Sequence, residues 1–257
     1  MKRFADQVVL IAAAAGRLGT ATTLRLASEG ASLVLGDLNG EAVDRLAAEV
    51  REKGGEAIGL PLDVTDEESV KSFVAAGLTE FGRVNGAFVN AGLTDPAVVR
   101  QDADALLTPL EVFDRTMAVN VRGHLLCARA VLPALLEQGG GGLVFTSSID
   151  AFDGGAERPA YAMSKVALTA LVRHIAGRWG KEGIRANAIA PGVIAVDLVA
   201  GSPPGTEEYR RVMLERTRSP RLGKGEDIAA GVAHLLSEDG EWINGQVIGI
   251  DGGLIMR

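Results

Sequence analysis

The stretch from Leu10 to Thr20 reads LIAAAAGRLGT, an apolar run followed by a turn of small residues and the start of a helical segment. This order predicts the strand, turn and helix that open a nucleotide-binding α/β fold. Four consecutive alanines occupy the turn where glycines normally let a pyrophosphate approach the backbone. Gly16 and Gly19 remain where the helix begins, and the free amides of a helix start bind phosphate. The stretch therefore predicts a dinucleotide turn in a modified form.

Short β-rich runs alternate with segments of helical length along the chain. We expect strands at residues 7–13, 32–37, 56–63, 84–90, 142–147, 184–191 and 246–251. We expect helices at about 17–30, 41–53, 66–81, 110–137, 159–181 and 226–237. The expected strands are almost continuously apolar, which is typical of a parallel sheet covered by helices on both faces. Because the alternation runs through residues 1–257 without a linker or a repeat, we predict a single α/β domain.

The composition is that of a globular protein, with 47% hydrophobic and 23% charged residues in a chain of 257. A formal net charge of −7 argues against a nucleic-acid partner. The single cysteine, Cys127, allows no intrachain disulfide and suits a reducing compartment. Asp6 and Gln7 interrupt the pattern of a secretory signal, and no run approaches the ~18 apolar residues of a membrane span. We therefore expect a cytoplasmic protein without a membrane partner.

Two long segments interrupt the alternation. Residues 94–109 follow the fourth expected strand, and residues 193–221 follow the sixth. Both leave from carboxyl ends of strands, where open α/β sheets bind ligands, so we expect them to border a binding site, with 193–221 as a substrate loop or lid. Arginines in the second segment alternate with glutamates, and we interpret this charge as a solvated helix face; the arginines are Arg210, Arg211, Arg216, Arg218 and Arg221.

Tyr161 and Lys165 stand four residues apart on an expected helix and therefore share one face. An ammonium beside a phenol favours the phenolate, which makes the tyrosine a better base near neutral pH. The same spacing occurs on many helices as surface packing, so the neighbours decide. Ser148 ends the fifth strand thirteen residues before Tyr161, Asn120 lies in the longest apolar helix, and Asn90 begins Asn-Ala-Gly after the fourth strand.

This set resembles the classical short-chain dehydrogenase/reductase family, and the resemblance extends from the first strand to the DGG at Asp251–Gly253. The resemblance implies a Rossmann-type doubly wound fold, with a seven-stranded parallel sheet in the order 3-2-1-4-5-6-7 and helices on both faces. It also implies a homotetramer. In that family, the residues that match Tyr161 and Lys165 act as the acid/base and as the lysine that lowers its pKa and holds the nicotinamide ribose. The residues that match Ser148 and Asn120 fix the substrate oxygen and hold a water that links the lysine to solvent.

Asp37, at the end of the second expected strand, favours NAD as the cofactor. Its carboxylate can accept hydrogen bonds from the adenine ribose and would repel a 2′-phosphate. Arg17 in the turn argues the other way, because a guanidinium can pair with that phosphate. The cofactor-binding residues that we predict are Ala13, Gly16, Arg17, Leu18, Gly19, Asp37, Leu38, Asp63, Val64, Asn90, Ala91, Gly92, Tyr161, Lys165, Pro191, Gly192, Val193 and Ile194.

The chain departs from the family pattern at three positions in the expected cofactor site. Ala12 and Ala13 replace the threonine and the first glycine of the turn, and Val196 stands where the family often has a threonine that bonds the nicotinamide amide. An alanine in place of that glycine is tolerated if its φ stays negative and is costly if its φ is positive. The three departures leave the strength of cofactor binding open.

The resemblance implies an NAD(H)-dependent oxidoreductase that interconverts a secondary alcohol and a ketone. Pocket walls of mixed apolar and acidic character suit a neutral substrate, including a cyclic or steroid-like one; the expected contacts are Ser148, Asp150, Phe152, Tyr161 and Val193. The alternatives are a 3-oxoacyl thioester reductase of the same family, a lyase or dehalogenase, and a nucleotide-binding module without turnover. His124, His174 and His234 stand singly, so no metal site is expected.

Overall fold

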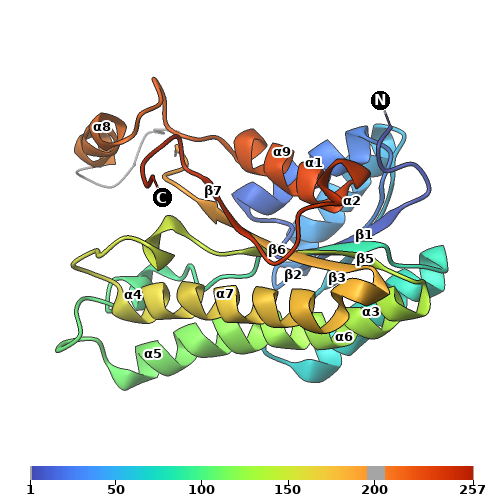
Figure 1. The fold of residues 1–257 in the computed structure, drawn as a ribbon, viewed down its shortest axis with the longest axis horizontal. Helices are drawn as coiled ribbons and strands as arrows, with labels where there is room; N and C mark the ends of the chain where they lie inside the picture. Colours follow the sequence, from blue (N-terminus) through green and yellow to red (C-terminus); the bar gives the residue numbers. More distant parts are fainter. Residues whose placement is uncertain (1, 196–205, 257) are drawn as a thin grey trace.

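The computed structural model describes residues 2–195 and 206–256. Within these residues, seven parallel strands form one sheet in the order β3-β2-β1-β4-β5-β6-β7, which confirms the predicted topology (Figure 1). The strands are β1 (Val8–Ala12), β2 (Ser32–Asp37), β3 (Glu56–Pro61), β4 (Gly86–Val89), β5 (Gly141–Thr146), β6 (Ile184–Pro191) and β7 (Val247–Ile250). The strand order reverses between β1 and β4, so a crevice is expected at the carboxyl ends of these strands.

Helices cover both faces of the sheet, as the apolar strands predicted. One apolar core lies between the sheet and α1 (Arg17–Ser28), α2 (Gly40–Glu52) and α9 (Gly225–Leu236). The other core lies between the sheet and α3 (Glu67–Phe81), α6 (Gly123–Glu137) and α7 (Pro159–Trp179). Figure 1 shows these two layers on opposite sides of the strands. The described chain also has α4 (Pro96–Val99), α5 (Leu110–Met117) and α8 (Thr206–Arg216) in the segments that follow β4 and β6.

Local residues explain where the helices beside the site begin and end. The Asn39 side chain accepts a hydrogen bond from the Ala42 amide at the start of α2, and Asp66 accepts one from Glu68 at the start of α3. Gly82 ends α3 in the left-handed conformation, with φ of 72°. The helix boundaries expected from the sequence are therefore correct to within about two residues, the usual margin of such boundaries.

The expected helix over residues 110–137 is continuous but irregular. A π-helical turn at Ala118–Arg122 joins α5 to α6, and it contains Asn120. Contrary to our expectation, the segment Leu110–Glu137 is long and apolar enough to cross a membrane by length and composition, and 56% of its most apolar window is buried inside the fold. The buried side chains of α6 belong to the core beneath β4 and β5, which accounts for their apolarity.

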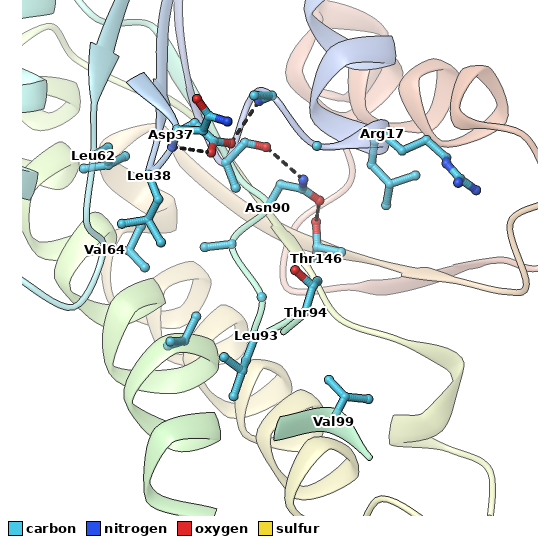
Figure 2. A pocket seen from close by; sticks show the side chains of 18 of the residues that line it. Arg17, Asp37, Leu38, Leu62, Val64, Asn90, Leu93, Thr94, Val99 and Thr146 are labelled. Carbon is cyan, nitrogen blue, oxygen red and sulfur yellow. Dashed lines mark hydrogen bonds between the residues drawn. The ribbon is translucent and has the colours of Figure 1, made fainter. Parts of the chain in front are cut away.

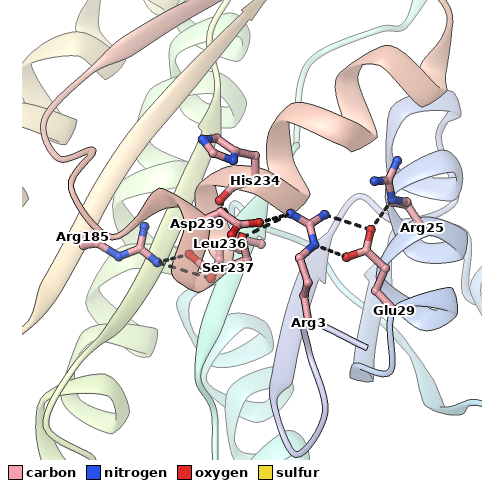
Figure 3. Close-up of polar contacts among 8 residues, drawn as sticks. All are labelled: Arg3, Arg25, Glu29, Arg185, His234, Leu236, Ser237 and Asp239. Carbon is pink, nitrogen blue, oxygen red and sulfur yellow. Dashed lines mark hydrogen bonds and ion pairs between the residues drawn. The ribbon is translucent and has the colours of Figure 1, made fainter. Parts of the chain in front are cut away.

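Ion pairs join the N-terminal segment to the ends of α1 and α9, away from the crevice (Figure 3). The Arg3 guanidinium pairs with Glu29 at 2.6 Å and with Asp239 at 2.7 Å, and Arg25 also pairs with Glu29. Arg185, at the amino end of β6, donates to carbonyl oxygens at the end of α9, including those of Leu235, Leu236 and Ser237. Arg185 thus satisfies carbonyl groups that the end of α9 leaves free, and Arg3 and Arg25 pair with carboxylates, so we assign this region a structural role.

Candidate active site

A cavity of about 720 Å³ opens at the carboxyl ends of β1, β2, β4 and β5 (Figure 2). One end reaches Asp37 and Leu38 after β2, and the other reaches Tyr161 and Lys165 on α7. The structure thus brings together, around one cavity, many side chains that are far apart in the sequence. Of the predicted site residues, those lining the cavity are Ala13, Gly16, Arg17, Leu18, Asp37, Leu38, Val64, Asn90, Ala91, Gly92, Tyr161 and Lys165.

The alanine-rich turn is braced by hydrogen bonds from two neighbouring strands. The Asn90 side chain donates to the Ala13 carbonyl oxygen at 3.2 Å and accepts a hydrogen bond from Thr146 at 2.9 Å. The Ala15 amide donates to the Asp37 carboxylate at 3.0 Å (Figure 2). These contacts hold the turn in place although Ala12 has no hydroxyl group to brace it.

Ala13 has a positive φ of 60°, in the region that favours glycine. An L-residue in this conformation costs roughly 1–2 kcal/mol because its Cβ crowds the backbone. The structure therefore has the costly one of the two expected conformations at Ala13. The turn adopts the conformation of the glycine-containing loop with some strain.

We expect Ala13→Gly to raise the free energy of unfolding by about 1 kcal/mol, because it relieves the strain of a positive φ at the smaller entropic cost of glycine. Ala12→Gly is the matched control, since Ala12 is buried in β1 and its φ is not positive. The control should lose about 1 kcal/mol. Urea denaturation of both variants measures the two changes, and destabilisation by Ala13→Gly would contradict the assignment of strain.

Asp37 and Arg17 lie on different sides of the turn. Asp37 accepts hydrogen bonds from the Ala15 and Asn39 amides, each at 3.0 Å. The Arg17 guanidinium donates to the Ala195 carbonyl oxygen at 2.5 Å, and Figure 2 shows its side chain directed away from Asp37. The two groups on which our choice of cofactor depends are therefore separated in space.

Lys165, Asn120 and Ser148 are buried around the carboxyl end of β5. The Lys165 ammonium donates to the Thr146 carbonyl oxygen at 2.8 Å, and Ser148 is 8% exposed. The Asn120 side chain accepts a hydrogen bond from the Leu93 amide at 2.8 Å and donates to the Ser164 hydroxyl at 2.9 Å. Asn120 thus ties the end of the Asn-Ala-Gly segment to the helix that presents Tyr161.

The charges around Tyr161 differ from the simple expectation of a phenol beside one lysine. Burial raises the pKa of Tyr161, while the Ser148 hydroxyl and the Arg158 guanidinium oppose that rise. Burial, and then repulsion from Arg158, lowers the pKa of Lys165 to about 7. The Lys165 ammonium lies 5.5 Å from the centre of the Tyr161 ring, whereas the Arg158 guanidinium lies 4.0 Å from it. Arg158 is therefore the closer of these two cations.

The remaining predicted contacts lie beside the cavity or away from it. Asp150 is near Tyr161 through Arg158, at 3.8 Å from its guanidinium. Phe152 lines a separate hollow with Val247, because the short helix after Ser148 turns it toward β7. Val193 lines another hollow, since its carbonyl oxygen accepts the Gly223 amide at 3.1 Å. Gly19, Asp63, Asn120, Ser148, Pro191, Gly192 and Ile194 also do not line the main cavity, and Val196 lies outside the described residues.

Several cavity residues were not predicted from the sequence. Arg158 and Thr146 line the cavity beside Tyr161 and Lys165, and Leu62 lines its other end near Leu38. A local signal exists for Arg158, which is a charged residue one turn before the tyrosine. No local signal distinguishes Leu62 or Thr146 from ordinary residues at strand ends.

The fold and this site define a class of protein, the dinucleotide-binding α/β oxidoreductases. A family model described as enoyl-(acyl carrier protein) reductase matches residues 12–255. Levodione reductase of Leifsonia aquatica is 38% identical over 258 residues, covering 98% of this chain and 95% of that protein. The 7alpha-hydroxysteroid dehydrogenase of Bacteroides fragilis is 33% identical over 257 residues, covering 100% of this chain and 97% of that protein.

A solved structure shows the same likeness in three dimensions. It is a 7α-hydroxysteroid dehydrogenase complexed with NADH and 7-oxo glycochenodeoxycholic acid, with a TM-score of 0.88 and 28% identity. The likeness covers 98% of this chain and 96% of that one. The chain belongs to the short-chain dehydrogenase/reductase family and is an oxidoreductase of that family.

Proposed function

We propose that this protein is an NAD(H)-dependent oxidoreductase that interconverts a secondary alcohol and a ketone. The observation that carries the proposal is a single cavity with Asp37 at one end and Tyr161 and Lys165 at the other. The cavity fits a dinucleotide, because the start of α1 opens onto it and a Cβ added at Gly16 would meet no atom closer than 3.8 Å. When bound, NAD(H) accepts or supplies the hydride.

Asp37 and Arg17 support NAD rather than NADP. The Asp37 carboxylate borders the cavity and can accept further hydrogen bonds from ribose hydroxyls. Arg17 is engaged with the Ala195 carbonyl oxygen and directed away from Asp37, so it does not supply a cation for a 2′-phosphate there. The structural relative in complex with NADH is consistent with this choice.

Tyr161, Ser148 and Lys165 have separate roles in the proposed reaction. In the reductive direction, the Tyr161 hydroxyl donates its proton to the substrate oxygen, and in the oxidative direction its phenolate accepts that proton. The Ser148 hydroxyl donates a hydrogen bond that holds the same oxygen. Lys165, anchored on the Thr146 carbonyl oxygen, binds ribose hydroxyls. Asn120 fixes the position of this helix and holds water beside the lysine.

The charges of residues 206–221 support a neutral substrate over a highly anionic one. Arg211 pairs with Glu208 at 2.7 Å and with Glu215 at 2.8 Å, and Arg221 pairs with Asp227 at 2.7 Å. These two arginines are thus engaged with acidic neighbours, as on a solvated face. The names of the two relatives above support a cyclic or steroid-like ketone. A further relative at 34% identity, the 3-oxoacyl-(acyl-carrier-protein) reductase of Thermotoga maritima, keeps a 3-oxoacyl thioester reductase as the second candidate.

Fluorescence titration with NADH and NADPH tests the proposal. We expect NADH to bind at micromolar concentration and to support reduction of ketones from a panel that includes cyclic diketones and oxosteroids. Activity confined to acyl thioesters would favour the second candidate. Failure of both cofactors to bind at millimolar concentration would contradict the assignment as an NAD(P)-dependent oxidoreductase.

We also propose a homotetramer and a cytoplasmic location. Light scattering of the purified protein tests the homotetramer, and fractionation of the cells that produce the protein tests the location.

We expect Asp37→Ala to reduce the preference for NADH over NADPH by about tenfold, or ~1.4 kcal/mol, because it removes the repulsion of a 2′-phosphate. The measured quantity is the ratio of the two dissociation constants. Loss of the hydrogen bond to the Ala15 amide loosens the turn and weakens the binding of both cofactors alike. The ratio of the dissociation constants therefore isolates the effect of the charge. An unchanged ratio would remove Asp37 from the argument for NAD.

A further inference from the structure

Arg158 is held in an unfavourable backbone conformation directly before the catalytic helix. Its φ of 66° and ψ of 49° are left-handed, which costs a residue with a Cβ roughly 1–2 kcal/mol. The Arg158 amide donates to the carbonyl oxygens of Asp102 and Ala103, each at 3.1 Å. Strained residues of this kind persist where their surroundings over-determine them, and they gather at functional sites. The strained backbone of Arg158 therefore indicates a functional role at this site.

Asp102, in the segment after β4, holds Arg158 and the start of α7 in this conformation. Asp102 is 4% exposed, and its carboxylate accepts hydrogen bonds from the Ala160 amide at 3.1 Å and the Tyr161 amide at 2.9 Å. The first turn of α7 is thus capped by a residue far away in the sequence, since Arg158 itself makes no side-chain cap. This frees the Arg158 side chain to extend along the helix.

The Arg158 side chain extends over the face of Tyr161. Its guanidinium carbon lies 4.0 Å from the centre of the ring, within the range of a cation–π contact. The guanidinium is also 3.8 Å from the Asp150 carboxylate, which is longer than a hydrogen bond. Its Nε is buried and has no hydrogen-bond partner among residues 2–195 and 206–256. The guanidinium therefore stacks over the face of the Tyr161 ring and lies beyond hydrogen-bond distance of the Asp150 carboxylate.

We propose that Arg158 is a second cation of the active site, held over the Tyr161 ring so that it stabilises the phenolate. The inference rests on the proposed function in taking Tyr161 as the acid/base. Arg158 acts through Tyr161, so it is a positioning residue that sets the charge of the site. Lys165, farther from the ring and anchored on a backbone carbonyl, is then available to bind ribose.

The charged groups that face Tyr161 determine the signs of the expected shifts. Arg158 faces Tyr161 from the position just before α7, and Lys165 faces it from α7 itself. Asp150 faces it from the turn after Ser148. Asp102 contacts its amide from behind, and Asp153, paired with Arg216 at 3.3 Å, lies beyond Asp150. Loss of a nearby cation disfavours the phenolate and raises the tyrosine pKa, whereas loss of a nearby anion lowers it.

The test is a spectroscopic titration of Tyr161 without substrate. The chain has two tyrosines, so in a Tyr209→Phe background the tyrosinate absorbance reports Tyr161. We expect Arg158→Gln to raise the pKa of Tyr161 by about one unit, and Arg158→Lys to raise it less, because a lysine keeps the charge. Asp150→Asn should shift it downward. The matched control is Arg216→Gln, which removes a cation that faces Asp153 and should leave the titration unchanged.

Two results would overturn the inference. One is an unchanged pKa of Tyr161 in Arg158→Gln while circular dichroism shows that the variant remains folded. The other is an upward shift of equal size in Arg216→Gln, which would make the effect a general one of net charge. If Arg158→Gln does not fold, an upward or absent shift in Asp150→Asn contradicts the proposed signs. The titration of Tyr161 needs no turnover. A protein that is inactive with NAD(H) would therefore contradict the proposed function without changing the outcome of the titration.

In an active enzyme, the pH profile of kcat/KM gives a second readout. The pKa on the acidic side of the oxidative profile should rise by the same amount in Arg158→Gln as in the titration. Below that pKa, a shift of one unit lowers kcat/KM about tenfold. Arg158→Lys should restore part of the loss. A uniform decrease at all pH values, without a shift, would show a structural role and contradict the proposal.

Discussion

Replacing Tyr161 by phenylalanine is expected to lower kcat about 10³-fold while NADH binding changes less than about threefold. The ring that packs beneath Arg158 is kept, so the helix and the cavity should remain intact. What is lost is the hydroxyl group that transfers the proton to or from the substrate oxygen. Steady-state rates with a ketone from the panel and fluorescence titration with NADH measure the two quantities separately.

Tyr209→Phe is the matched control for this prediction. Tyr209 is 55% exposed on α8 and does not line the cavity. It should retain full kcat and full NADH affinity. Wild-type turnover in Tyr161→Phe would assign proton transfer to another group, and loss of NADH binding would show that the substitution disturbs the cofactor site instead.

Gly19→Ala is expected to lower the free energy of unfolding by about 2 kcal/mol, although alanine is ordinarily better than glycine in a helix by ~1 kcal/mol. A Cβ at Gly19 would lie 2.3 Å from the Ala13 carbonyl oxygen and 2.6 Å from that of Ala14. Both are backbone atoms, so the turn and α1 must move apart. Denaturation by urea measures the loss, and an NADH titration of the folded fraction should show weaker binding.

Gly16→Ala separates the cofactor from the fold. A Cβ at Gly16 would meet only the Ala13 carbonyl oxygen at 3.8 Å, and the φ of −74° suits alanine. Stability should therefore change by less than about 0.5 kcal/mol, as is usual away from packed positions. Because Gly16 lines the cavity, we expect NADH affinity to fall about tenfold, or ~1.4 kcal/mol. Equal effects of the two substitutions on stability would contradict the geometry of the turn.

Periodicity was sufficient to predict the elements of this fold. The strand expected at residues 184–191 is β6, Ile184–Pro191, and the helices expected near 17–30 and 159–181 are α1 and α7. Burial on both faces requires continuous apolar runs in the strands, and that requirement is local. The π-helical turn around Asn120 has no such local requirement and was not predicted.

The residues that matched family motifs were found one by one, but their charges depend on distant neighbours. The sequence placed Tyr161 and Lys165 on one face and left Arg158 unnoticed. The sequence also did not determine the direction of the Arg17 side chain or the sign of φ at Ala13, because each depends on contacts from other strands.

Spacing within each segment was enough for the parallel α/β architecture and for Tyr161 and Lys165 on one helical face, because hydrophobic burial and helical geometry act over a few residues. The position of Arg158 over Tyr161 required the folded chain. Its anchor is Asp102, which the sequence separates from α7 by β5 and the long helix. Hydrogen bonds and charge pairs between such distant segments leave no periodic trace in the sequence.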